Sequence, residues 1–391
     1  MRRLAPKRTL PYALLGLFVT FFGYRMVRPM NIFVVGDAFE RPIPITSAPR
    51  GLQSLSAIEC ARCHTEIYEE WSASVHAQAW IDPYFQVDFA FDGSQQICRN
   101  CHTPLQNQQE HLVVGFRDRE KLKPVLAPNQ AFDPGLQAEG VTCTACHVRG
   151  ETIIGPYGDT RAPHATRRDP AMTDGFGACT RCHVVSGNRW DTFYRIPPCG
   201  TVAEISEAGT ATDCTGCHMP AVVRPAWNGG VPRPGRKHLW KGGHDPAMVR
   251  QAVDVDLDVV SAGGATGRKV ILTLTNVGTD HYFPTGTPDR HLTVDFRLKS
   301  AAGKVLKSQR HVLKRTTLWR PFIVDLWDTR LPKGEPRAYL FDVPLDSEPS
   351  PTLLDVVVRY HLLDEARRRR IGYKNQEPIT SVIYETEVPL E

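Results

Sequence analysis

The amino-acid sequence predicts a multidomain protein with an N-terminal apolar helix, a mainly α-helical and irregular middle region, and a C-terminal all-β sandwich. Three observations carry this prediction. A basic segment and an apolar run open the chain, five copies of one cysteine motif follow, and apolar and polar residues alternate from about residue 251. The length of 391 residues fits two or three domains.

The middle region is organised around C-x-x-C-H, which occurs five times between residues 60 and 218. This motif attaches a c-type haem, because its two thiols form thioethers with the porphyrin and the adjacent His ligates the iron. The sequence therefore predicts five covalently bound haems c. The predicted attachment residues are Cys60, Cys63, Cys98, Cys101, Cys143, Cys146, Cys179, Cys182, Cys214 and Cys217. The predicted proximal iron ligands are His64, His102, His147, His183 and His218.

Two other uses of paired cysteines explain the pattern less well. A structural zinc site uses two such pairs, so five pairs leave one over, and zinc gives no reason for a His after every second Cys. A thioredoxin-like redox site needs a single pair near a βαβ unit. The eleventh cysteine, Cys199, is either a small packed thiol or a reactive or ligating one.

The composition agrees with a haem-dominated middle region. Apolar residues make up 41% of the chain, and 31 Pro and 30 Gly disfavour long helices and a large aliphatic core. Porphyrin faces supply apolar surface instead, so folding is expected to depend on haem. The formal charge of +5 does not indicate nucleic-acid binding, because haem propionates offset it and no nucleic-acid module is recognisable.

The first 30 residues predict export and attachment to a membrane. Four basic side chains precede an apolar run from Leu10 to Tyr24, and Arg25 and Arg28 follow it. Because no A-x-A-like cleavage site follows, a retained signal anchor with its amino terminus inside is favoured over a cleaved signal peptide. The expected location is the periplasmic side of the bacterial inner membrane; a cleaved signal peptide gives a soluble periplasmic protein instead.

The remaining boundaries follow from shifts in composition. Residues 31–55 are an expected linker, 56–250 the haem domain and 251–391 the sandwich. Within the haem domain, Ile67–Trp80 is the best candidate for a helix.

Alternating residues predict that the C-terminal domain is an immunoglobulin-like sandwich. The pattern is clear over Val253–Val260, Lys269–Leu274, His291–Leu298 and Leu354–Tyr360. A basic run, Arg367–Arg370, is either the solvated end of a short helix or a docking patch for an acidic partner.

Each haem iron needs a second protein ligand, or it stays open to small molecules. Outside the motifs, the haem domain contains five further His, which equals the number of motifs. We expect these residues to be distal ligands of mostly bis-His, low-spin irons. They are His76, His111, His164, His238 and His244.

The first motif, followed by Trp71-Ser-Ala-Ser-Val-His76, resembles the multihaem cytochrome c superfamily, which includes the tetrahaem nitrification cytochromes (cytochrome c-554-like) and the hydroxylamine oxidoreductases. The resemblance implies that His76 ligates the iron of a different haem. The segments His238–His244 and His281-Tyr-Phe-Pro-Thr-Gly286 are similar to parts of larger members, in which the second segment abuts the haem domain. His281 therefore competes with His111 for the fifth distal position. The predicted number of haems is neither the four nor the eight of these related proteins, so the resemblance implies no substrate for this chain.

Two functions stay open at this point. In the first, the protein is an electron carrier that accepts electrons at the membrane, from a quinol-oxidising or other respiratory complex, and passes them to a periplasmic redox partner. In the second, it oxidises or reduces a small nitrogen or sulfur species at one five-coordinate haem. All five motifs end in His, which argues against the Lys-ligated haem of pentahaem nitrite reductases. The electron carrier is favoured, and no catalytic residue is predicted.

Overall fold

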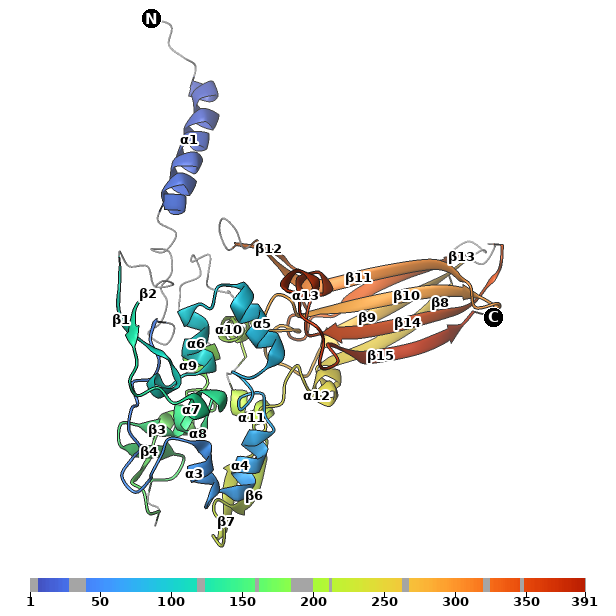
Figure 1. The fold of residues 1–391 in the computed structure, drawn as a ribbon. Coiled ribbons are helices and arrows are strands. Elements are labelled where there is room, and N and C mark those ends of the chain that lie inside the picture. Colours follow the sequence, from blue (N-terminus) through green and yellow to red (C-terminus); the bar gives the residue numbers. More distant parts are fainter. Residues whose placement is uncertain are drawn as a thin grey trace, which may run out of the picture.

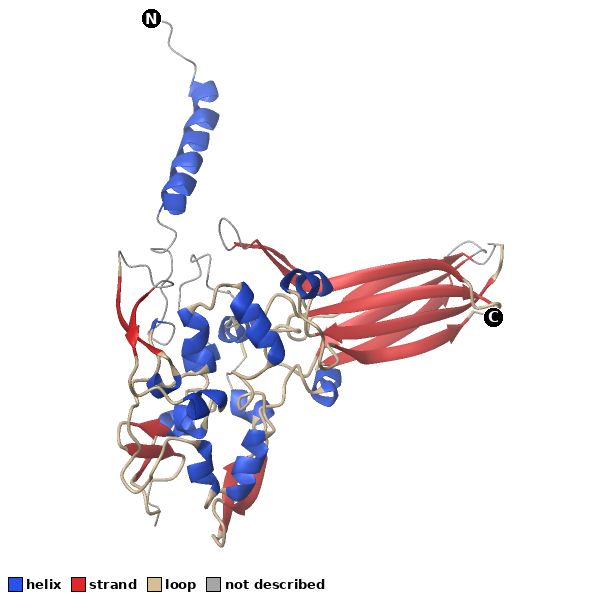
Figure 2. Cartoon of the chain, viewed as in Figure 1, coloured by secondary structure: helices blue, strands red, loops and turns tan. Residues whose placement is uncertain are grey.

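The computed structural model describes residues 6–27, 40–117, 124–158, 162–183, 200–210, 213–261, 267–318, 324–344 and 348–390. A region of short helices lies beside a β-rich domain (Figures 1 and 2). Helix α1 covers Pro6–Val27. In the described part of the chain, no helix is long and apolar enough to cross a membrane. The predicted membrane helix is therefore not supported.

The helices of the middle region are short, as the Pro and Gly content predicts. Three of them, which begin after Asp82, Asp133 and Asp245, start with Asp-Pro: the carboxylate accepts backbone N–H groups of the first turn, and Pro occupies the first helical position. The helices of this region are α3 (Ala57–Ala61), α4 (Thr65–Ser72), α5 (Pro83–Phe91), α6 (Gln96–His102), α7 (Pro134–Ala138), α8 (Cys143–His147), α9 (Thr180–His183), α10 (Thr201–Ala208), α11 (Cys214–His218) and α12 (Pro246–Gln251).

The helix expected over Ile67–Trp80 ends earlier than predicted. Helix α4 stops at Ser72, and turns follow it. The indole of Trp71 donates a hydrogen bond to the carbonyl oxygen of Val141 (2.9 Å), and the Val141 amide donates to the carbonyl oxygen of His76 (2.9 Å). These tertiary contacts override the helical pattern, and they fix the turn that carries His76.

Three small sheets complete the described part of the middle region. They are β1 (His111–Phe116) with β2 (Pro124–Pro128), β3 (Val148–Arg149) with β4 (Thr152–Gly155) and β5 (Thr166–Arg168), and β6 (Ala221–Pro225) with β7 (Pro232–Arg236). The hairpin of β6 and β7 packs on the first motif, where the Asn228 amide donates to the carbonyl oxygen of Cys63 (2.8 Å).

The C-terminal region is a sandwich of two antiparallel sheets. One sheet has the order β13-β9-β8 and the other β12-β11-β10-β14-β15. Strands β8, β9 and β13 take the places of A, B and E in one sheet, and β10, β14 and β15 take those of C, F and G in the other, as in immunoglobulin domains, while β11 and β12 extend the second sheet beyond β10. The strands are β8 (Val253–Ser261), β9 (Gly267–Asn276), β10 (His291–Ser300), β11 (Val305–Leu318), β12 (Val324–Asp328), β13 (Arg337–Pro344), β14 (Pro351–His361) and β15 (Thr380–Pro389).

The core of the sandwich forms between its two sheets. Phe296 of β10 stacks on Phe341 of β13 with ring centroids 5.3 Å apart, and both side chains are fully buried. Buried and exposed residues alternate along β13, whereas β10 is buried over most of its length.

The sandwich contacts the haem region through helix α13 (Glu365–Ile371). Arg367 forms ion pairs with Asp88 (2.5 Å) and Asp92 (3.2 Å) at the C-terminal end of α5. Arg368 and Arg369 pair with Glu365 within α13 itself. Part of the basic run at 367–370 is therefore engaged inside the molecule.

Candidate haem-binding site

Each of the five motifs lies on a short helix or helical turn. In α8, Cys143 and Cys146 are three residues apart, and His147 follows four residues after Cys143. Residues at this spacing share one face of a helix, so both thiols and the imidazole point to the same side. The other motifs lie on α6, α9, α11 and the junction of α3 with α4.

All five motifs face one cavity of about 2460 Å³. Its lining includes the ten motif Cys and the five motif His, together with many apolar side chains. Pockets for single small ligands measure roughly 300–1000 Å³, so this cavity has room for several cofactors. Paired thiols and imidazoles around a mostly apolar space suit haem c in both chemistry and size.

Backbone carbonyls fix the orientation of the motif His. The Nδ1 atoms of His64, His102, His147 and His218 lie 2.5–2.9 Å from the carbonyl oxygens of Ala226, Ala79, Ile154 and Lys241. An Nδ1–H donor bonded in this way leaves Nε2 as the free acceptor of the ring. Such partners are typical of metal-ligating His, because they hold the ring in a ligating orientation.

Two distal candidates face motif His at the spacing expected for a shared iron. The ring centroids of His147 and His238 are 6.1 Å apart, and those of His76 and His183 are 6.4 Å apart. An imidazole nitrogen ligates a transition metal at about 2 Å, with the ring centroid about 1 Å further back, so two rings on opposite sides of one metal stand about 6 Å apart. Both pairs therefore have room for one iron between them.

The remaining distal candidates lie as follows. His164 is near His64, which lowers the pKa of His164 after the larger effect of burial. His281 is near His218: burial lowers the pKa of His281 most, Tyr282 and Glu204 oppose this, and His218 lowers it further. His244 shares a charged neighbour, Asp82, with His102. The sequence also proposed His111, but this residue begins strand β1, is exposed and does not line the cavity. His281, from the sandwich, does line it.

Burial keeps the candidate ligands in the form that binds metals. It lowers the pKa of His76 to about 3, with His183 as the next cause, and that of His238 to about 4, with His147 next. Both rings are therefore neutral at pH 7, and neutral imidazole is the ligating form.

Contacts between thiols connect the motifs to one another. Cys60 lies beside Cys143, Cys101 beside Cys182, and Cys179 beside Cys214. Counted along the chain, the first motif therefore touches the third, and the fourth touches both the second and the fifth. Burial and then Cys182 of the fourth motif raise the pKa of Cys146 in the third motif, so the five motifs form one connected set that branches at the fourth.

Two motifs of this set, the first and the fifth, reach the surface. Among the ten motif thiols, Cys63 of the first motif and Cys217 of the fifth are exposed, whereas the other eight are partly buried. Cys199 lies outside the described residues.

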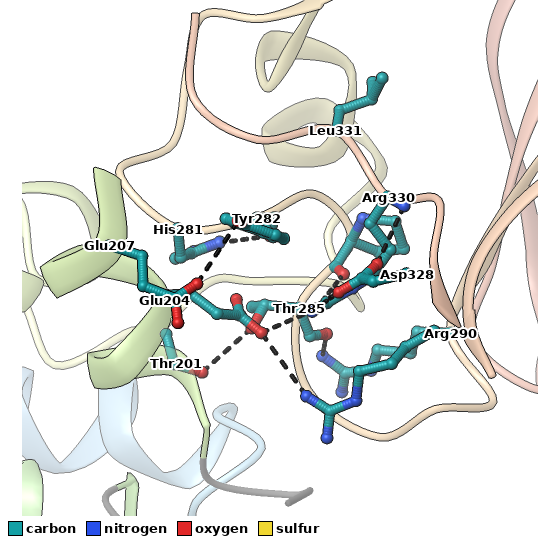
Figure 3. A network of polar contacts seen from close by, with 12 residues as sticks. Thr201, Glu204, Glu207, His281, Tyr282, Thr285, Arg290, Asp328, Arg330 and Leu331 are labelled. Carbon is teal, nitrogen blue, oxygen red and sulfur yellow. Dashed lines mark hydrogen bonds and ion pairs between the residues drawn. The ribbon is translucent and has the colours of Figure 1, made fainter. Parts of the chain in front are cut away.

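A buried polar network beside His281 was not predicted from the sequence (Figure 3). Glu204 of α10 binds Arg330, and Arg330 in turn binds Asp328. Thr285, in the segment that follows His281, donates a hydrogen bond to Glu204 (2.7 Å). Nothing in the sequence pairs Glu204 with Arg330, because they lie in different domains.

Fold and site together define a multihaem c-type cytochrome that carries a β-sandwich. Residues 59–148, which contain the first three motifs, match the family model described as cytochrome c554 and c-prime. This match confirms the resemblance to the multihaem cytochromes c and supports haem c as the cofactor.

One solved structure shares the fold of most of this chain. The penta-heme cytochrome c552 from Thermochromatium tepidum is 20% identical, and the match covers 88% of this chain and 100% of that chain with a TM-score of 0.63, which shows a shared fold. The putative ApaA protein from Bordetella pertussis is 13% identical over 35% of this chain and 91% of that chain, with a TM-score of only 0.20. The comparison with curated protein sequences finds no match.

Proposed function

We propose that this cytochrome carries five haems c and transfers electrons between protein partners. The observation that carries the proposal is the cavity lining: five motif His and five further His surround one space, and two pairs already stand about 6 Å apart. Haem iron supplies a one-electron redox centre, and two His ligands keep it coordinatively saturated. The protein's part is to hold the ligands, bury the irons and set their potentials.

The proposed distal ligands are His76, His164, His238, His244 and His281. Two assignments rest on facing rings: His238 with His147, and His76 with His183. Two more, His164 with His64 and His281 with His218, rest on electrostatic proximity. His244 then belongs to His102. We leave His111 out because it lies on an exposed strand outside the cavity.

Electrons enter and leave at the two exposed motifs, near Cys63 and Cys217. At the first motif, the hairpin of β6 and β7 presents exposed Val223 and Val231 beside Trp227. Arg233 lies over the Trp227 ring, with its guanidinium carbon 5.4 Å from the ring centroid. An apolar patch with basic residues around it fits a redox protein with an acidic surface.

We propose a periplasmic location, as haem attachment and the basic, apolar start of the chain both favour export. Fractionation of cells that express the full chain tests this. Haem-stained protein in the periplasmic or periplasm-facing membrane fraction supports the proposal, whereas protein in the cytoplasm opposes it.

EPR of the oxidised, purified protein tests the electron-transfer proposal, combined with a haem count by pyridine haemochrome. We expect five haems per chain, all low-spin. A high-spin signal from about one iron in five contradicts the proposal and favours catalysis on a small nitrogen or sulfur species. That open iron would be sought first at the second motif, where His244 is assigned from a shared neighbour and not from a facing ring.

A further inference from the structure

The segment that carries His281 comes from the sandwich, yet an ion pair buried between the two domains fixes it to the haem region. We propose that Glu204 and Arg330 form an interdomain latch, which positions His281 to ligate the iron of the motif that starts at Cys214. The inference rests on the proposed role of His281 and adds the residues that place it. Glu204 and Arg330 are positioning residues, since neither is proposed to touch the iron.

The latch is buried and well connected. Glu204 is 1% exposed and Arg330 is 3% exposed. The Nη1 atom of Arg330 donates to Oε1 of Glu204 (2.8 Å) and to the carbonyl oxygen of Pro284 (3.0 Å). Asp328 holds the other side of the guanidinium, at 2.6 Å from Nη2. Arg330 is thus clamped between α10 of the haem region and the His281 segment (Figure 3).

Glu204 also holds the segment directly. Its Oε2 accepts the hydroxyl hydrogen bond of Thr285 (2.7 Å), and Thr285 lies 3.1 Å from the hydroxyl of Thr201 at the start of α10. One carboxylate oxygen of Glu204 therefore binds Thr285, which follows His281 in the chain. The other binds Arg330, which also contacts the carbonyl oxygen of Pro284 in the same segment. A shift of Glu204 moves these groups together.

His281 itself is fixed from the opposite side. Its carbonyl oxygen accepts hydrogen bonds from Asn276 Nδ2 (2.8 Å) and from the hydroxyl of Thr279 (2.7 Å). Its Nδ1 lies 2.9 Å from the carbonyl oxygen of Tyr282, which leaves Nε2 free for a metal. The Tyr282 ring packs under the Arg330 guanidinium at 5.2 Å. The sandwich fixes one end of the segment, and the latch fixes the other.

Stability alone explains this arrangement poorly. A buried ion pair gains little over well-packed apolar side chains, whereas removal of one partner leaves an uncompensated buried charge. Such a pair is better suited to fix one geometry than to add free energy. The domains have a second connection, Arg367 with Asp88, so the latch is not needed merely to hold them together.

The test substitutes Glu204→Gln, which keeps the size of the side chain and removes its charge. EPR of the oxidised holoprotein is expected to show a high-spin signal of up to one iron in five. Because partners that orient a ligand typically contribute 10–100-fold to metal affinity, exogenous imidazole should bind that iron about 10–100-fold more tightly than in the unsubstituted protein. Glu204→Asp should restore most of the low-spin signal.

Two further variants separate the possible explanations. Asp295→Asn removes a buried carboxylate with two Arg partners inside the sandwich, Arg310 at 2.5 Å and Arg359 at 3.2 Å, and it should leave all irons low-spin. Thr285→Val removes one hydrogen bond to Glu204 with little change in volume, and it should give a smaller high-spin signal. If Glu204→Gln fails to take up haem, this milder variant tests whether the latch positions His281.

The outcomes are distinct. Low-spin irons with unchanged imidazole affinity in Glu204→Gln, or in Thr285→Val if the first variant does not fold, overturn the latch. An equal high-spin signal in Asp295→Asn also overturns it, because general loosening of the sandwich then explains the effect. His281→Ala tests the proposed role of His281 as an iron ligand, on which the latch depends. Five low-spin irons in that variant overturn this ligand assignment, whatever the latch variants show.

Discussion

The imidazole rings of His147 and His238 face each other with their centroids 6.1 Å apart and their planes tilted by 30°. His147 ends the short helix α8, and His238 follows strand β7, so the β6–β7 hairpin and the chain after it bring the second ring to the first. The backbone amide of His238 donates a hydrogen bond to Glu70 (2.8 Å), and Glu70 also binds Arg224 of β6. Helix α4 thus fixes the hairpin and its His together.

The substitution His238→Ala should open the iron held by His147. We expect a high-spin signal of about one iron in five and carbon monoxide binding at that iron after reduction, since one strong ligand is lost. EPR and visible spectroscopy measure both.

His111→Ala is the matched control for this prediction. His111 is exposed and lies outside the cavity, so its loss should leave all irons low-spin. A high-spin signal in the control, or none in His238→Ala, would show that the assignment of distal ligands is wrong.

Val231→Glu should slow electron uptake from an acidic redox protein. Val231 is 77% exposed at the β6–β7 hairpin, beside the first motif, and a carboxylate there both removes apolar contact and repels an acidic partner. A plant-type ferredoxin serves as the acidic donor in stopped-flow measurements at low ionic strength. We expect a second-order rate constant lower by about tenfold, because charges at an interface act mainly on association.

Val259→Glu controls for this substitution. Val259 is also exposed, at 42%, but it lies on strand β8 of the sandwich. It should leave the rate constant unchanged. Equal slowing in both variants would mean that the hairpin is not the contact surface and that net charge alone sets the rate.

The stability of the sandwich should depend on pH through His361. Burial lowers the pKa of His361 to about 4, and His291, stacked on it with a centroid distance of 4.3 Å, is the next cause. The folded state therefore binds fewer protons than the unfolded chain, in which His titrates near 6.5. The stability contributed by neutral His361 is present above about pH 6.5 and is lost as the pH falls towards 4. With a discount for solvent screening, the change is about 1 kcal/mol.

Thermal melts of the holoprotein followed by far-UV circular dichroism measure this dependence. The melting temperature should fall more steeply between pH 6.5 and 4 in the unsubstituted protein than in His361→Gln. His111→Gln, an exposed His, should keep the steeper slope. Parallel curves for all three proteins would show that His361 does not govern acid stability in this range.

Sequence reasoning reached the parts of this molecule that depend on short spacing. The spacing within C-x-x-C-H places both thiols and the imidazole on one face of a helical turn, and α8 shows that arrangement directly. Alternation predicted β8, β9, β10 and β14, and along most of β9 every second residue is buried.

The features that the sequence did not predict depend on packing between residues far apart in the chain. His111 and His281 were equivalent candidates on paper, and only the fold shows that one begins an exposed strand whereas the other lines the cavity. The early end of α4 has the same origin, since the Val141 amide binds the carbonyl oxygen of His76, which a continued helix would use for its own hydrogen bonds. The pairing of Glu204 with Arg330 joins two domains and leaves no local pattern.

Unfolding of the sandwich should open one haem iron, because the sandwich supplies His281. Phe296→Ala removes a fully buried ring from the sandwich core, and such substitutions cost about 3–5 kcal/mol. For a domain of this size the melting temperature should fall by roughly 10 °C. Visible spectra should show conversion of about one iron in five to high spin at the lowered temperature at which the β-sheet signal is lost, while the other irons stay low-spin to higher temperature. If all irons remain low-spin through the sandwich transition, then the fifth distal ligand comes from the haem region and not from His281.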